Sequence, residues 1–343
     1  MLPGPGADSI LRSAITGWGI ALPDTRLTNA DLAQRVDTTD DWIVERTGIR
    51  ERRMAGPGET TATLAIAAGA AAIRHASLTP EDIDLLILAT TTPEQPVPHT
   101  SAFVQAGLGL RSGAFDINTG CAGFVYSLVV GGLLQQAGAF GAVLVVGAET
   151  LTRIVDYSDR TTCVIFGDGA AAVVLQPAAG ADGPGLLAWD LGCDGSGADL
   201  IEVRAGGSRL PASPAALAAG EQWVRMDGPE VFRRAVRGMA DSALAVLDRA
   251  GRTAGEVALL VPHQANGRIV DAVARRLGIP PERTAKNVDR YGNTSAASVP
   301  LALAEAADAG RLRPGDLVLL TAVGAGLGWG SALVRWGRGA PDS

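Results

Sequence analysis

The sequence places one cysteine where a thiol can become a nucleophile. Cys121 stands in D-I-N-T-G-C-A-G-F, where an extended apolar segment passes into an uncharged stretch that predicts a long helix. Unpaired amides at a helix N-terminus carry partial positive charge and favour thiolate over thiol, and the apolar run that follows keeps water away. A small cysteine buried in the core is the structural alternative. Two further polar segments favour the chemical interpretation.

These segments surround His263 and Asn293. His263 ends a predicted buried strand in V-P-H-Q-A-N and begins a polar turn, and strand ends in sheets of this type collect reactive groups. Asn293 follows a glycine in Y-G-N-T-S-A-A-S and precedes small residues that can open a helix. A hydrogen-bonded structural histidine and an ordinary turn asparagine remain the alternatives when each is taken alone.

A glycine-rich segment, V-G-A-G-L-G-W-G-S, follows the last long predicted strand. Glycines allow backbone amides to approach a ligand closely, and such amides can form an oxyanion hole. The same segment is equally compatible with a tight turn at a subunit contact.

Composition restricts the class of protein that must position these groups. The chain has 343 residues, 47% of them hydrophobic, and a net charge of −7, which predicts a compact protein and gives no reason to expect nucleic acid. No secretory signal is evident, and the 32 uncharged residues between Asp116 and Glu149 predict a buried helix and strand, not a membrane span. Three cysteines without metal-ligand spacing predict reduced thiols, no metal site and a cytoplasmic location.

Strands and helices alternate along most of the chain, which predicts an α/β fold with parallel or mixed sheets covered on both faces. Strands are predicted at 14–23, 83–91, 114–118, 142–149, 186–193, 257–263 and 316–323. Helices are predicted from Thr28 or Asn29, at 61–76 and 100–108, after Cys121, and at 229–250, 266–277 and 298–309. The alternation of strands and helices in the first half repeats in the second, so we divide the chain into a tail (1–12) and two duplicated halves (13–178 and 179–343). Residues 205–220 are predicted to form a surface excursion or flap.

Several motifs together resemble the β-ketoacyl-acyl carrier protein synthase III family of thiolase-fold condensing enzymes. The resemblance covers almost the whole chain, including the spacing of Cys121, His263 and Asn293. It rests on D-D-W-I-V-E-R-T-G-I-R-E-R-R (40–53), G-C-A-G-F (120–124), S-D-R-T-T-C-V-I-F-G-D-G-A (158–170), H-Q-A-N-G-R-I (263–269), G-N-T-S-A-A-S (292–298) and G-W-G-S-A-L (328–333). It implies a thiolase-like duplicated fold of five αβαβα layers with mixed sheets.

The resemblance also implies two half-reactions. Cys121 accepts an acyl group, and the amides of Cys121 and Ala325 form the oxyanion hole. His263 and Asn293 then donate hydrogen bonds to the thioester carbonyl of a malonyl group as it loses carbon dioxide, where fixed donors in a dry pocket stabilise the developing charge.

By the same resemblance the acyl donor is a coenzyme A (CoA) thioester, which is a substrate, and no cofactor is expected. Trp42 and Arg160 sandwich its adenine, with Thr38 beside it and Arg46 near the phosphates, which suits indole and guanidinium chemistry. The malonyl group arrives on an acidic acyl carrier protein. The expected docking residues are Gln264, Ala265, Asn266, Gly267, Arg268, Arg233, Arg275 and Arg276, although a solvated helix face also explains Arg275 and Arg276.

The resemblance further implies a homodimer in which Val97 reaches the partner's acyl tunnel, where its modest size suggests a primer that is branched or larger than acetyl. Asp168, Cys163 and Cys193 are assigned to structure, Asp168 in a turn and Cys163 in an apolar strand. Two alternatives stay open: a thiolase-fold acyltransferase or starter-unit enzyme of a specialised, polyketide-type pathway, and a catalytically silent acyl-binding protein. A thiolase is disfavoured because no cysteine follows Cys193.

Overall fold

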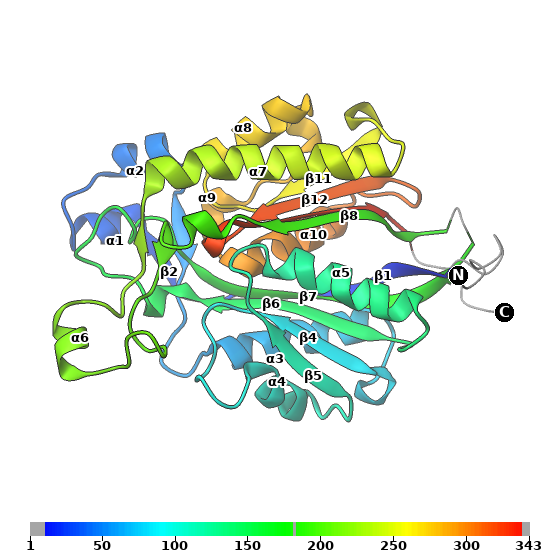
Figure 1. Cartoon of the computed structure of the whole chain (residues 1–343), viewed down its shortest axis with the longest axis horizontal. Helices are drawn as coiled ribbons and strands as arrows, with labels where there is room; N and C mark the ends of the chain where they lie inside the picture. The colour runs from blue at the N-terminus through cyan, green and yellow to red at the C-terminus, as the bar shows by residue number, and fades with distance from the viewer. Residues whose placement is uncertain (1–10, 181–182, 338–343) are drawn as a thin grey trace.

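The computed structural model describes residues 11–180 and 183–337, and two central sheets organise this part of the chain. The first sheet has the strand order β1-β7-β6-β4-β5 and the second has the order β11-β12-β13-β8 (Figure 1). Their strands are β1 (Leu11–Ala21), β4 (Leu85–Ala89), β5 (Gly113–Ile117), β6 (Val143–Thr150) and β7 (Asp168–Ala179), then β8 (Gly185–Cys193), β11 (Val257–Pro262), β12 (Leu317–Val323) and β13 (Gly328–Arg335). Both sheets are mixed, as predicted, because parallel and antiparallel pairs occur in each.

The α-helices of the described chain are α1 (Asn29–Ala33), α2 (Asp40–Thr47), α3 (Thr61–His75), α4 (Thr100–Leu108), α5 (Gly123–Gln136), α6 (Pro214–Ala218), α7 (Gly228–Arg249), α8 (Gly267–Leu277), α9 (Val288–Tyr291) and α10 (Ser298–Asp308). Six of them form three layers around the two sheets. In Figure 1, α3 and α4 cover one outer face, α7 and α8 cover the other, and α5 and α10 lie between the sheets. The predicted five layers are confirmed.

Strand β4 shows why the sheets need helices on both sides. Its side chains alternate between two cores: Leu85 and Ile87 join the core around α5, whereas Leu86 and Leu88 join the core under α3. All five residues of β4 are buried. A strand buried on both faces reads as a continuous apolar run, which is the pattern seen in its sequence.

Four short strands lie outside the central sheets. They are β2 (Arg26–Thr28) paired with β3 (Glu51–Arg53), and β9 (Ile201–Glu202) paired with β10 (Arg225–Met226). Strand β2 leads into α1, whose N-cap is Thr28, one of the two caps that the sequence predicts. The predicted surface excursion 205–220 contains the short α6 and follows β9.

Some predictions about individual segments are wrong. Strand β1 begins at Leu11, so the predicted tail is two residues too long, and its first ten residues lie outside the described part of the chain. Cys163 is buried as expected, but it lies in a turn. Asp168 begins β7 instead of lying in a turn. Strands β7 and β13 are additions to the predicted elements; the alanine run in β7 and the glycines in β13 have low intrinsic strand preference.

Within the described residues, no helix is long and apolar enough to cross a membrane.

Candidate active site

A pocket of about 890 Å³ opens between the two halves of the fold and brings the three predicted reactive residues together. Cys121 comes from the segment before α5, His263 from the end of β11, and Asn293 from the loop between α9 and α10. These segments are far apart in sequence, but the fold of the two sheets brings the start of α5, the end of β11 and the end of α9 to one pocket.

Two glycines bring the amides of Cys121 and Ala325 next to each other. A Cβ atom on Gly120 would lie 2.4 Å from the amide nitrogen of Ala325, and one on Gly324 would lie 2.5 Å from the amide nitrogen of Cys121. Gly120 also has a φ of +59°, which glycine adopts at low cost. The glycine-rich segment therefore acts as a close backbone neighbour of Cys121, which is the arrangement an oxyanion hole needs.

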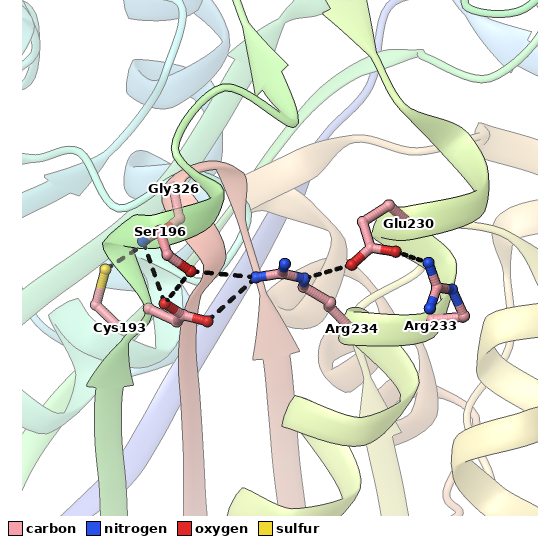
Figure 2. Close-up of polar contacts among 7 residues, drawn as sticks. Cys193, Ser196, Glu230, Arg233, Arg234 and Gly326 are labelled. Carbon is pink, nitrogen blue, oxygen red and sulfur yellow. Dashed lines mark hydrogen bonds and ion pairs between the residues drawn. The ribbon is translucent and has the colours of Figure 1, made fainter.

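Polar contacts hold the far side of this glycine-rich loop. The thiol of Cys193 donates to the carbonyl of Gly326 at 3.2 Å. Figure 2 also shows a second set of contacts close by, in which Arg234 of α7 reaches Ser196 and Glu230, and Glu230 reaches Arg233. Cys193 thus has the structural role that the sequence analysis gives it.

The structure corrects the expected ionisation of Cys121. The thiol precedes α5 as predicted, but burial raises its pKa to about 12, and the negative charge of Glu149 adds to that rise. A hydrogen bond from the Ser295 side chain acts in the opposite direction. The cysteine therefore rests as a thiol at neutral pH, and position before a helix does not by itself make it a thiolate.

His263 is held in one orientation by Ser298. Its ring Nδ1 lies 2.6 Å from Ser298 Oγ, and the amide of Gln264 lies 3.4 Å from the same oxygen. Because the amide can only donate, the hydroxyl accepts from it and is free to donate to Nδ1. In the tautomer in which Ser298 donates to Nδ1, the proton of the neutral ring lies on Nε2, which can then serve as a donor in the pocket.

The environment of His263 predicts a flat pH response. Burial lowers the pKa of His263 to about 3, so the ring is neutral above that pH and gains charge only below it. The ring proton resonances of His263 should therefore show no titration near pH 6.5, the ordinary histidine value. NMR spectra recorded between pH 5 and 8 check this, with a His263→Ala variant to assign the resonances, and a titration step near 6.5 would contradict it.

Asn293 is fixed by its own loop. Its Oδ1 accepts a hydrogen bond from the Ser295 amide at 2.8 Å, which leaves the Nδ2 amide group free to donate. Asn293 is 6% exposed, and its backbone bonds to Ile165 in the other half of the chain. The side chain thus offers a donor to the same pocket as His263 Nε2.

An arginine-rich group surrounds Trp42 at the pocket mouth. Trp42 and Arg46 line the pocket, and the guanidinium groups of Arg46 and Arg160 lie 4.9 and 5.1 Å from the Trp42 ring centroid. Arg160 also donates to the carbonyl of Asp37 at 2.9 Å. The nearby hydroxyl of Thr38 is buried and has no hydrogen-bond partner among the described residues.

Among the predicted docking residues, the arginines are exposed, whereas two other residues are not. Arg233 and Arg268 line the pocket and lie on α7 and α8, and Arg275 and Arg276 lie on the exposed face of α8. Ala265 and Asn266 also line the pocket, and Asn266 caps α8.

The structure contradicts direct carrier contact for Gln264 and Gly267. Gln264 is 0% exposed because its side chain bonds to the backbone of Pro262, Ala285 and Asn287. Gly267 is buried because α8 packs against the end of α2, where a Cβ atom would lie 3.2 Å from the Thr47 carbonyl.

Sequence reasoning missed the polar residues behind the three central ones. Ser298, Ser295 and Glu149 contact or face them from within the protein. A signal for Glu149 was present, since it is the first charge after 32 uncharged residues. Val97 is 80% exposed and does not line the pocket of its own chain. No residue of the predicted flap at 205–220 lines the pocket either, whereas Val203 and Val224, which flank that segment, do.

Comparisons with known proteins agree with this arrangement. The family model described as 3-oxoacyl-[acyl-carrier-protein (ACP)] synthase III matches residues 115–195, and the model of its C-terminal part matches residues 247–336. The β-ketoacyl-[acyl-carrier-protein] synthase III of Roseiflexus sp. (strain RS-1) is 55% identical over 94% of this chain and 98% of the relative, and that of Symbiobacterium thermophilum is 50% identical over 94% and 98%. The solved synthase III of Thermus thermophilus is 46% identical with a TM-score of 0.88, over 96% of this chain and 100% of that one. The chain therefore belongs to the β-ketoacyl-[acyl-carrier-protein] synthase III family and has its thiolase-like α/β fold.

Proposed function

We propose that this protein catalyses the decarboxylating condensation of an acyl-CoA primer with malonyl-acyl carrier protein. The products are 3-oxoacyl-acyl carrier protein, CoA and carbon dioxide, and the reaction initiates fatty-acid synthesis. The observation that supports this most strongly is the convergence of Cys121, His263 and Asn293 on one pocket.

In the first half-reaction, the sulfur of Cys121 attacks the thioester carbonyl of acyl-CoA. The carbonyl oxygen becomes negative, and the amides of Cys121 and Ala325 donate to it. The close packing of Gly120 against the Ala325 amide and of Gly324 against the Cys121 amide supports this role. Collapse of the tetrahedral intermediate releases CoA and leaves the acyl group on Cys121. Trp42, Arg46 and Arg160 offer aromatic and cationic surfaces for the adenine and phosphates of CoA. The half-reaction needs no metal or cofactor.

In the second half-reaction, the malonyl thioester loses carbon dioxide. Negative charge moves onto its thioester oxygen, where His263 Nε2 and Asn293 Nδ2 donate hydrogen bonds. Both side chains are nearly excluded from water, so their positions are fixed before the reaction begins. The resulting carbanion attacks the acyl carbonyl on Cys121, the bond from that carbon to the sulfur breaks, and the departing thiolate takes a proton from solvent.

One assay tests this function. Purified protein is mixed with acyl-CoA and malonyl-carrier protein, and release of carbon dioxide is followed for straight, branched and aromatic primers. We expect carbon dioxide release that the primer increases, and 3-oxoacyl-carrier protein that forms only when both substrates are present. The preferred primer then reports the size and shape of the acyl pocket. No release with any primer would contradict the proposed condensation.

The exposed arginines on α7 and α8 give a prediction about carrier docking. Arg268→Glu should raise the KM for malonyl-carrier protein about tenfold and leave acylation by acyl-CoA unchanged, because charge reversal weakens association with an acidic partner. Arg209→Glu, in the exposed segment before α6, is the matched control. Steady-state kinetics at two salt concentrations check this. An unchanged KM in Arg268→Glu would remove this residue from the docking surface.

We further propose that the protein is a homodimer. Strand β5 forms an edge of its sheet, and Val97 and Phe103 are exposed near α4, which packs beside β5. Joining two β5 edges would continue the sheet and bring Val97 to the partner. Analytical ultracentrifugation should then give twice the chain mass of 35.0 kDa.

The three unpaired thiols are compatible with a reducing, cytoplasmic location.

A further inference from the structure

A buried carboxyl group lies behind the proposed nucleophile. Glu149 ends the run of apolar residues in β6 and is 0% exposed. No salt bridge to it exists among the described residues, although burial of an unpaired carboxylate is costly. A carboxylate that is buried without a neighbouring cation is retained either because many hydrogen-bond donors stabilise its charge or because the group has a function.

Donors converge on Glu149 from two loops. The Thr91 amide donates to both carboxylate oxygens at 3.1 Å, and the Thr92 hydroxyl donates to Oε2 at 2.6 Å. From the other side, the Ala296 amide lies 3.5 Å from Oε1. Amides can only donate, so these contacts favour the ionised carboxylate, which can accept a proton, and they oppose the burial that raises the pKa of Glu149.

Ser295 connects this carboxylate to the nucleophile. The Ser295 side chain acts to lower the pKa of both Cys121 and Glu149, as a nearby hydrogen-bond donor does. Ser295 and Cys121 both line the pocket, and the amide of the next residue, Ala296, lies 3.5 Å from Glu149 Oε1. Ser295 also has a φ of +46°, a conformation that non-glycine residues rarely adopt. Backbone strain of this kind gathers at functional sites, where the surrounding structure enforces it.

We propose that Ser295 and Glu149 form the proton route that activates Cys121 for acyl transfer. This inference rests on the proposed function of Cys121. In this route Ser295 is the catalytic residue, because it takes the proton from the reacting sulfur, and Glu149 acts through it as the final proton acceptor.

The route conserves atoms and charge. The Cys121 thiol gives its proton to Ser295 Oγ while the Ser295 hydroxyl proton passes to the Glu149 carboxylate. The sulfur forms its bond to the acyl carbon, and the bond from that carbon to the CoA sulfur breaks. The proton held by Glu149 returns through Ser295 to the departing CoA thiolate, so that CoA leaves as a thiol and Glu149 is again ionised.

The ionisation of the site explains why such a route is needed. With a pKa raised to about 12 by burial, Cys121 is almost entirely a thiol at neutral pH. His263 is a poor proton acceptor because burial lowers its pKa to about 3, and its Nδ1 already bonds to Ser298. Burial also raises the pKa of Glu149, which brings it nearer the neutral range where a general base works best.

A simple electrostatic role for Glu149 predicts the opposite effect of mutation. Its negative charge opposes formation of the Cys121 thiolate, so removing the charge alone should make the thiol more reactive. Removing a proton acceptor should make it less reactive. The sign of the change therefore separates the two roles.

The test measures alkylation of Cys121 by iodoacetamide at pH 7, followed by mass spectrometry of the peptide that contains it. This readout requires no acyl-CoA or malonyl substrate. We expect Glu149→Gln and Ser295→Gly each to slow alkylation at least tenfold, since general-base transfer contributes about 10²–10⁴-fold. The double variant should be no slower than the slower single variant, because the two groups act in series, and Glu149→Asp should restore part of the rate.

Two controls separate this role from damage to the fold. Ser295→Gly removes the hydroxyl while glycine accepts the positive φ without strain. Asp168→Asn changes another buried carboxyl that accepts from Thr152 and Ala55 but does not line the pocket, and it should leave Cys121 alkylation unchanged. Should Glu149→Gln fail to fold, Glu149→Asp decides the matter, because it keeps the negative charge but moves the proton acceptor: alkylation slower than in the wild type supports the route, and an unchanged rate overturns it.

Alkylation that is unchanged or faster in Ser295→Gly, or faster in folded Glu149→Gln, overturns the proton route. Failure of the condensation itself has a different signature. In that case the wild-type protein releases no carbon dioxide with any primer, whereas the alkylation rates of these variants still report on the route.

Discussion

Replacement of Cys121 by alanine should lower acyl transfer and condensation by about a thousandfold or more. The sulfur is the only group in the proposed mechanism that bonds to the acyl carbon, and loss of a nucleophile has effects of this size or larger. Decarboxylation of malonyl-carrier protein should persist, because His263 and Asn293 remain in the pocket. Incubation with labelled acyl-CoA and counting of protein-bound label measures the loss.

The other two cysteines provide controls for this variant. Cys163 is buried in a turn outside the pocket, and Cys193 is exposed, so Cys193→Ala should retain covalent labelling. Label still bound covalently to Cys121→Ala protein would place the nucleophile elsewhere in the chain.

Replacement of His263 or Asn293 by alanine should lower malonyl decarboxylation about 10²–10³-fold. Each variant removes one fixed donor from a dry site, and single oxyanion donors have effects of that magnitude. Acylation of Cys121 should change little, because neither side chain belongs to the pair of amides at Cys121 and Ala325. Carbon dioxide release and acyl labelling, measured on the same preparations, separate the two half-reactions.

His99→Ala is the control for the histidine variant, because His99 precedes α4 and does not line the pocket. If acylation and decarboxylation fell equally in both variants, the assignment of His263 and Asn293 to the second half-reaction alone would be wrong. That result would mean that these residues support the first half-reaction as well.

Local sequence patterns predicted most of the helices and buried strands. Helix α3 was expected at 61–76 and spans Thr61–His75, because a threonine cap and an alanine-rich apolar face define it locally. Strand β4 was recognisable as a short apolar run. Strand β7 was missed because burial by both helix layers, which the sequence does not show, makes an alanine-rich segment into a strand.

The chemistry of the site was predictable only in part. Cys121, His263 and Asn293 were selected from their motifs, and the structure brings them into one pocket. The raised pKa of Cys121 was not predictable, because it comes from burial and from Glu149, which a distant strand brings behind the thiol. Gln264 was misassigned because adjacency to His263 does not reveal which way a side chain points.

The most direct measurement is a single-turnover chase of the acyl-enzyme. Protein carrying a labelled acyl group on Cys121 is freed of acyl-CoA and mixed with excess malonyl-carrier protein, and both carbon dioxide and labelled products are followed in time. We predict that the label leaves Cys121 and appears as 3-oxoacyl-carrier protein at the rate of carbon dioxide release, with one carbon dioxide for each label transferred. Label that remains on Cys121 while carbon dioxide is released, or that appears only as free acid, would contradict condensation through this cysteine.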